Sequence, residues 1–183
     1  YIGNWNSSIS WISDSTIAQS APVEMDFYAG YKKEIAKDLT ADIGLLQYYY
    51  PTSGITSTAY SNPNTTEAYV ALSYQFITFK YSYALTDLFG NINSKGSQYF
   101  DLSANYDTGF EGLTLNAHVG RQTVVNATGA NYTDWKLGVT KDLGKGLSAA
   151  VSYIGTTADV GFYVLNGKNT GGSTALVSLT KTF

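Results

Sequence analysis

A period-two alternation of apolar and polar residues recurs along this chain in segments of roughly ten residues. In the segment 23–32, every second position from Val23 to Tyr31 is apolar, whereas the intervening positions begin with Glu24 and Asp26. Because successive side chains of a strand point to opposite faces, this pattern predicts strands with one apolar and one polar face. A tilted strand of about this length is also long enough to cross the hydrocarbon core of a bilayer.

Ten such strands are predicted, at 1–11, 23–32, 39–49, 67–75, 78–86, 98–106, 113–122, 134–141, 147–156 and 173–183. The connections after the first, third, fifth, seventh and ninth strands are long and rich in Ser, Thr, Asn and Gly, whereas the others are tight. Outer-membrane barrels have short periplasmic turns and long external loops. Residues 1–183 are therefore predicted to form one all-β domain, a transmembrane antiparallel up-and-down β-barrel of the bacterial outer membrane.

The aromatic residues favour the same fold. Sixteen tyrosines occur, and Tyr48, Tyr49 and Tyr50 end the third predicted strand. Trp5 and Trp11 are assigned to the apolar side of the first strand. Tyr and Trp prefer the membrane interface because one end of the ring is apolar and the other can stay hydrated. An aromatic girdle is thus predicted, although a water-soluble β-sandwich, a lipocalin-like barrel or an amyloid-like assembly remains an alternative.

Composition excludes several functional classes. The chain has no cysteine, which excludes disulfide scaffolds, zinc ribbons and thiol catalysis. A net charge of −3 is too small to indicate nucleic acid as a partner. His118 is the only histidine, and we expect it to hydrogen-bond a neighbouring carboxylate or tyrosine on the polar face of the seventh strand. We therefore expect no metal, no cofactor and no enzymatic activity.

The polar faces of the predicted strands carry the candidate functional residues. The residues expected to line the lumen are Glu24, Asp26, Lys32, Asp42, Glu67, Lys80, Asp101, His118, Asp134 and Lys136. Carboxylates outnumber lysines in this set, and a constricted acidic passage favours cations over anions. A barrel of about ten strands is narrow, since eight strands are filled by side chains and sixteen or more leave a channel. The alternative is that these charges pair across the interior as structural struts.

Several runs of the sequence are similar to those of a known family. They are 26–31 (DFYAGY), 48–51 (YYYP), 64–69 (NTTEAY), 80–83 (KYSY), 116–122 (NAHVGRQ) and 132–139 (YTDWKLGV). In these runs the chain resembles the TorF family, whose members are named as porins of the Gram-negative outer membrane. The resemblance extends from Tyr1 to Phe183. It implies two further strands ahead of those seen here, and hence a barrel of about twelve, but it supplies no solute.

The last residue adds one more expectation. Phe183 closes the final predicted strand, and such an aromatic terminus is similar to the signal that the barrel-assembly machinery reads in its clients. We expect that machinery, outer-membrane lipid and small solutes or ions to be the partners, and a homo-oligomer stays open. The expected function is a narrow passage for small solutes with a weak preference for cations. A structural or adhesive barrel with a closed lumen and functional external loops is the alternative.

Overall fold

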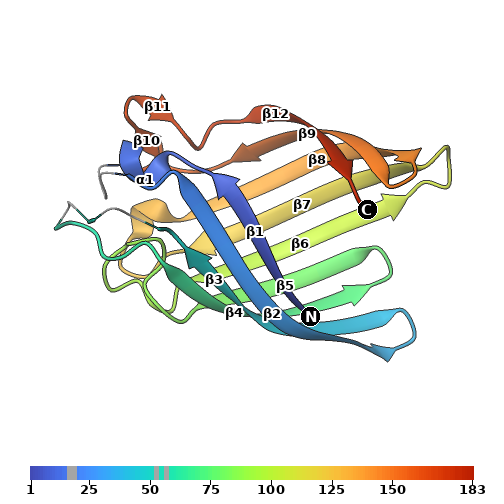
Figure 1. The fold of residues 1–183 in the computed structure, drawn as a ribbon, viewed down its shortest axis with the longest axis horizontal. Helices are drawn as coiled ribbons and strands as arrows, with labels where there is room; N and C mark the ends of the chain where they lie inside the picture. Colours follow the sequence, from blue (N-terminus) through green and yellow to red (C-terminus); the bar gives the residue numbers. More distant parts are fainter. Residues whose placement is uncertain (16–19, 52–53, 56–57) are drawn as a thin grey trace.

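The computed structural model describes residues 1–15, 20–51, 54–55 and 58–183, and it shows an all-β chain (Figure 1). The main strands are β1 (Ile2–Ser8), β2 (Val23–Ala36), β3 (Leu39–Tyr49), β4 (Thr65–Tyr74), β5 (Ile77–Ala84), β6 (Gln98–Asp107), β7 (Leu113–Thr123), β8 (Tyr132–Gly144), β9 (Leu147–Thr156) and β12 (Thr174–Lys181). They form one ten-stranded antiparallel sheet in which each strand pairs with the next along the chain. The predicted antiparallel up-and-down order is thereby confirmed.

Short elements occupy the connections between the strands. A one-turn helix α1 (Trp11–Asp14) follows β1, and a 3-10 turn η1 (Thr128–Ala130) precedes β8. The connection between β9 and β12 contains a small hairpin of β10 (Val164–Leu165) and β11 (Lys168–Asn169). Among the described residues, no helix is long and apolar enough to cross a membrane.

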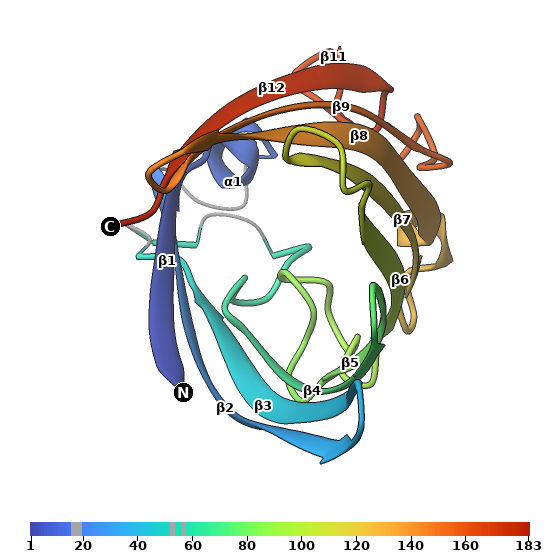
Figure 2. The same cartoon turned by 90° about the vertical axis from the view of Figure 1, so that its right-hand side faces the viewer.

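The sheet curves strongly around an interior (Figure 2). Its tight turns lie at one end, on the right in Figure 1, and its long loops lie at the other. The turn from β8 to β9 is one of the tightest, with positive φ at both Lys145 (53°) and Gly146 (73°). That backbone geometry matches the twist of the flanking strands in a two-residue hairpin. Within the described residues, no backbone pairing joins β1 to β12, so the sheet has two edges and its closure is not seen.

The strand register separates the two faces of the sheet. Every carboxylate within the ten strands lies on one face, which comprises Glu24, Asp26, Glu34, Asp42, Glu67, Asp101, Asp107, Asp134 and Asp142. This face is the concave one, because side chains meet across intervening strands. The Tyr1 hydroxyl, next to β1, donates to Asp42 on β3 over 2.7 Å. The Tyr99 hydroxyl on β6 likewise donates to Asp134 on β8 over 2.8 Å.

The convex face is apolar and exposed. Phe27, Val70, Leu102 and Val139 lie on it and are 46%, 42%, 47% and 40% exposed. Its charged residues are all basic and lie toward the strand ends: Lys33, Arg121, Lys141 and Lys181. The two clusters of buried apolar residues lie among the loops and not under this face.

Two assignments made from the sequence need correction. Trp5 pairs with Asp26, so it lies on the polar face of β1 rather than the apolar one. Trp11 belongs to α1 and not to the first strand, which ends at Ser8. At the other end of the chain, β12 ends at Lys181, so Phe183 lies beyond the strand, fully exposed.

Candidate functional site

The concave face brings together all the residues that alternation assigned to the interior. Cross-strand pairs connect them through the sheet: Asp42 pairs with Lys32 on β2, Lys80 with Asp101 on β6, and His118 with Lys136 on β8. The register thus places the ten predicted residues on one surface, although it distributes them along the length of the strands. Two groups of them make close contacts, one around His118 and one around Tyr48.

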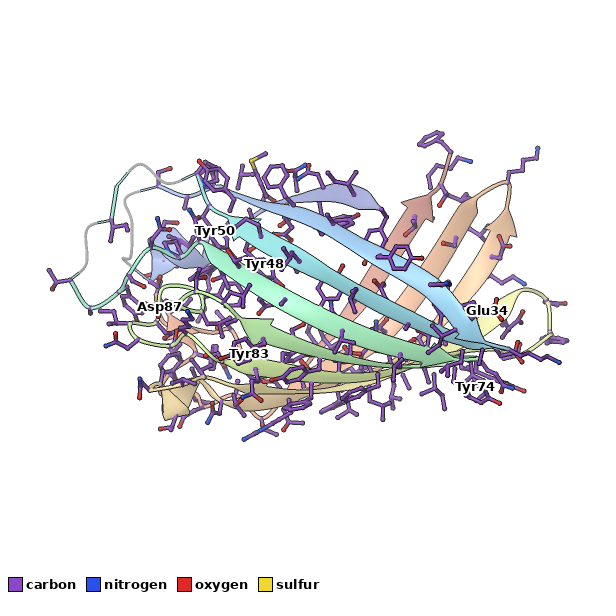
Figure 3. All side chains as sticks on the ribbon, turned by 90° about the horizontal axis from the view of Figure 1, so that it is seen from below. Glu34, Tyr48, Tyr50, Tyr74, Tyr83 and Asp87 are labelled. Carbon is purple, nitrogen blue, oxygen red and sulfur yellow. The ribbon has the colours of Figure 1, made fainter. Side chains whose placement is uncertain are left out.

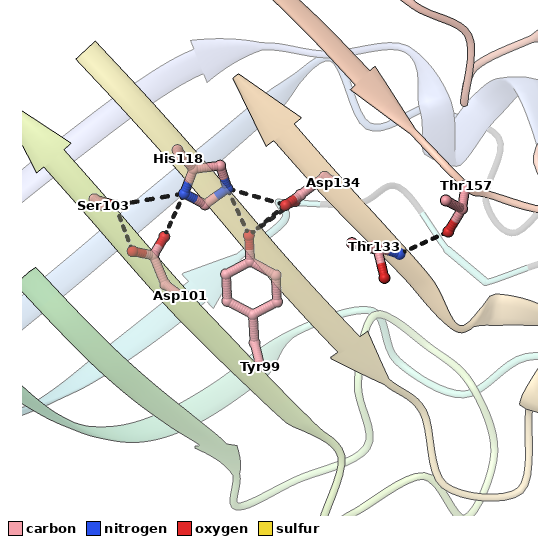
Figure 4. A network of polar contacts seen from close by, with 7 residues as sticks. All are labelled: Tyr99, Asp101, Ser103, His118, Thr133, Asp134 and Thr157. Carbon is pink, nitrogen blue, oxygen red and sulfur yellow. Dashed lines mark hydrogen bonds and ion pairs between the residues drawn. The ribbon is translucent and has the colours of Figure 1, made fainter. Parts of the chain in front are cut away.

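The first group is a polar network centred on the His118 ring (Figure 4). The ring Nδ1 lies 2.9 Å from Asp101 Oδ2, and Nε2 lies 2.9 Å from Asp134 Oδ1. The Tyr99 hydroxyl donates to Asp134 and also lies 3.2 Å from the ring Nε2. Ser103 donates its hydroxyl proton to Asp101 over 2.5 Å. Three neighbouring strands, β6, β7 and β8, supply these five side chains.

Each ring nitrogen of His118 has a carboxylate oxygen and a hydroxyl oxygen within hydrogen-bonding distance. A neutral imidazole has a single N–H, so both ring nitrogens can donate to carboxylates only when His118 is an imidazolium. The ring thus links Asp101 on β6 with Asp134 on β8 and connects β6, β7 and β8 on the concave face. The expectation that His118 hydrogen-bonds a carboxylate or tyrosine is confirmed.

The same contacts bear on nucleophilic chemistry. A serine triad needs a base nitrogen that faces the hydroxyl while a carboxylate holds the other nitrogen. Here both nitrogens of His118 face aspartates, and the Ser103 proton points to Asp101. The arrangement is therefore that of a hydrogen-bonded cluster that supports the wall of the sheet.

The second group lies near the loop end, where Tyr48 pairs with Asp26 on β2 and with Thr65 on β4, and Glu24 and Glu67 lie two residues from those partners on the same face. Tyr48 lies near this end of the sheet (Figure 3). Glu67 is only 7% exposed and no hydrogen bond to its carboxylate is seen within the described part of the chain. Asp26 has one carboxylate oxygen, Oδ1, that is buried without a hydrogen-bond partner. These carboxylates form an acidic region in which at least the Asp26 Oδ1 acceptor is left unused by the described part of the protein.

The lysines of the concave face do not neutralise this region by direct contact. The Nζ atom of Lys80 lies over the ring of Tyr69, 4.3 Å from the centroid. Among the described residues, no ion pair joins Lys32, Lys80 or Lys136 to a carboxylate. The balance of charge inside the sheet is therefore acidic, as the sequence predicted.

Two cavities open on the concave face. The larger, of about 630 Å³, is lined by the His118 network and by the connection between β9 and β12. The second, of about 380 Å³, lies at the loop end and is lined by Glu24 and by aromatic rings from several loops. In Figure 2, α1 and the long loops cross the opening of the curved sheet. Their apolar side chains pack there around Ile12 and Leu88, which are buried.

Sequence reasoning missed part of this loop-end cavity. Tyr50 and Tyr132 line the cavity, but they lie just outside the predicted strands 39–49 and 134–141, so the alternation did not assign them to the interior. The rings of Trp11, Phe89 and Tyr163 line it too, yet they come from irregular segments in which alternation gives no orientation. Only the tertiary arrangement of the loops reveals these rings.

These features define the class of the protein: a ten-stranded antiparallel β-sheet protein that curves around an acidic, polar interior. The chain belongs to Gcw_chp, a family described as a bacterial protein of unknown function, whose sequence model matches residues 1–183. No curated protein matches the chain. Membership of the TorF family of porins stays a prediction.

Proposed function

We propose that this protein is an outer-membrane β-barrel that gives small solutes, and cations in preference to anions, a narrow passage through its polar interior. The observation that carries the proposal is the separation of the two faces. All strand carboxylates are concave, and the middle of the convex face has no charged side chain. Lipid tolerates an apolar exterior of this kind, whereas water penalises it.

Aromatic side chains at both ends of the convex face support a membrane location. Tyr74, Phe76 and Tyr106 gather near the tight turns, where the Phe76 and Tyr106 rings meet edge to face at 5.3 Å. Tyr83 lies near the loops (Figure 3). A membrane-facing wall has such rings at its two interfaces and aliphatic residues between them. Phe183, in this proposal, is the residue that the barrel-assembly machinery recognises.

The preference for cations follows from the region around Tyr48. Glu24, Asp26 and Glu67 lie near one another with no lysine in ion-pair contact among the described residues. In a narrow passage of low dielectric constant, this excess of carboxylate attracts cations and repels anions. Glu67 is the best single residue to test because it is almost buried and not held by a hydrogen bond.

Conductance across a planar bilayer under a KCl gradient tests the proposal. We expect the wild-type protein to conduct, with a reversal potential of the sign that cation preference requires, and Glu67→Gln to move that potential toward zero. Glu111→Gln is the matched control, because Glu111 lies in a tight turn, paired with Lys141 at 3.6 Å on the outer side. A protein that inserts but passes no ions would exclude the passage.

The packing of the loops favours a second candidate function. Ile12 and Leu88 are buried in apolar clusters that lie across the loop end of the sheet. A barrel closed in this way would act through its external loops, as a structural or adhesive protein. The absence of conductance, in protein shown to be folded and inserted, would favour this function over the passage.

A further inference from the structure

We infer that the cavity at the loop end binds a small organic cation, such as a quaternary or primary ammonium group. This inference names the solute class of the proposed passage and in that respect rests on the proposed function. The cavity has a volume of about 380 Å³, which suits a small molecule. We call it the aromatic mouth, and the residues that define it are Trp11, Glu24, Tyr50, Phe89, Tyr132 and Tyr163.

The first argument is that several aromatic rings line the aromatic mouth and that contacts between them hold the rings in place. Trp11 meets Tyr50 edge to face, with centroids 5.5 Å apart and planes at 89°, and it meets Phe89 in a similar way at 6.3 Å. On the opposite wall, Tyr132 meets Tyr163 at 5.8 Å and 87°. An edge-to-face pair holds both rings in fixed orientations, and because the edge of one ring covers a single face of the other, the pair leaves at least one face of each ring outside the contact. Ring faces carry the negative end of the aromatic quadrupole and attract cations.

The second argument is charge. Glu24 is the only charged side chain that lines the aromatic mouth, counted over the described residues, and no lysine or arginine lines it. The Tyr50 hydroxyl donates to Glu24 Oε2 over 2.7 Å and fixes the carboxylate. Asp26 follows on the same face, with its buried and unpartnered Oδ1. A cation in this cavity would therefore meet both ring faces and a carboxylate.

The third argument separates a cation from a neutral polar ligand such as a sugar. A sugar needs free donors and acceptors, but most donors of the aromatic mouth already donate to the protein. The Gln122 amide donates to the carbonyls of Gln98 and Thr123, at 3.1 and 3.2 Å. The Tyr163 hydroxyl donates to the carbonyl of Ala130 at 2.7 Å. Ring faces and a carboxylate are prominent among the groups that remain, and these match an ammonium group better than a polyol.

Choline binding to the full chain in detergent micelles, measured by isothermal titration calorimetry, tests the inference. We expect choline to bind and its neutral isostere 3,3-dimethyl-1-butanol to bind at least about ten-fold more weakly. Trp11→Leu should weaken choline binding by about 5- to 30-fold, the range expected for loss of a cation–π contact. Glu24→Gln should weaken it to a similar extent. Trp135→Leu and Glu111→Gln are the matched controls, because neither residue lines the aromatic mouth.

Each result decides the inference. Equal binding of choline and the neutral isostere would overturn it, and so would binding of maltose in the absence of choline binding. Unchanged affinity in both Trp11→Leu and Glu24→Gln, with wild-type circular dichroism, would also overturn it. Conductance without choline binding would exclude the aromatic mouth as a cation site and leave the passage standing. Choline binding without conductance would exclude the passage and leave the site standing.

Discussion

An arginine placed on the convex face distinguishes lipid from water as its surroundings. Val70 lies in the middle of β4 and Ile77 begins β5 at a tight turn, yet both are 42% exposed on the same apolar face. Ile77 pairs with Tyr74, four residues beyond Val70. At about 3.4 Å per residue and a tilt of about 40°, the two positions differ in depth by about 10 Å along a membrane normal.

The expected costs follow from that difference in depth. An arginine near the bilayer midplane destabilises an outer-membrane barrel by about 2–4 kcal/mol, and one near the interface by about 0–1 kcal/mol. Val70→Arg should therefore lower the folding equilibrium constant by about 30- to 1,000-fold, and Ile77→Arg by less than about ten-fold. On the surface of a water-soluble protein, both substitutions would change stability by only about 0.5 kcal/mol.

Urea titrations of the protein in phosphatidylcholine vesicles, followed by tryptophan fluorescence, measure these costs. Val70→Thr and Ile77→Thr are the controls for loss of apolar area without a charge. The reasoning is refuted if Val70→Arg and Ile77→Arg have equal and small effects. It is also refuted if the wild-type protein stays monomeric and folded in buffer without lipid or detergent.

Three further predictions concern the interior and the loop end, with urea titrations as the measure of stability. His118→Leu should cost about 1–3 kcal/mol, because Asp101 and Asp134 lose their shared hydrogen-bonding partner; adding Asp134→Asn should recover part of the loss, and no recovery would contradict the role of the cluster. Gly44→Ala should cost about 1–3 kcal/mol, because its Cβ would lie 2.3 Å from the Tyr69 hydroxyl and 2.6 Å from a backbone oxygen, whereas Gly172→Ala, whose Cβ would make only an ordinary contact of 3.8 Å with Asn169 Nδ2, should cost little. Burial and the hydrogen bond to Glu24 raise the pKa of the Tyr50 phenol, so that the phenol stays protonated in the fold. Its contribution to stability is fully present below the unfolded-state pKa near 10 and is lost as the pH rises above it; an ultraviolet titration in which Tyr50→Phe removes a phenol with an ordinary pKa would contradict this.

The sequence predicted the sheet well because each strand carries its own evidence. The bounds of β3 (Leu39–Tyr49) and β9 (Leu147–Thr156) match the predicted ranges 39–49 and 147–156. Alternation also assigned the polar face. Once a single acidic residue such as Asp101 marks that face, every second residue of the same strand is assigned to it. The prediction for Trp5 is wrong because an aromatic ring does not by itself mark the apolar face of a strand. Trp5 pairs with Asp26 and therefore lies on the concave face.

The contacts between side chains could not be predicted in the same way. That Tyr99 reaches Asp134 depends on the register of β6, β7 and β8 together and on the curvature of the sheet. The aromatic mouth depends on loops that have no periodicity, so that Trp11 and Tyr163, far apart in the sequence, line one cavity. Local patterns define faces, and only the three-dimensional arrangement defines which residues of a face meet.

The unpaired edges of β1 and β12 restrict the number of strands that could close the sheet. With ten strands in strict alternation, these edges run in opposite directions, so that direct hydrogen bonding between them would be antiparallel. Inserting a hairpin of two strands keeps that match, whereas a single extra strand would force a parallel seam. In hydrocarbon, each backbone amide without a hydrogen bond along an open edge costs several kcal/mol. If every pair of neighbouring strands is to remain antiparallel, closing the sheet therefore takes either no additional strand or an even number of them.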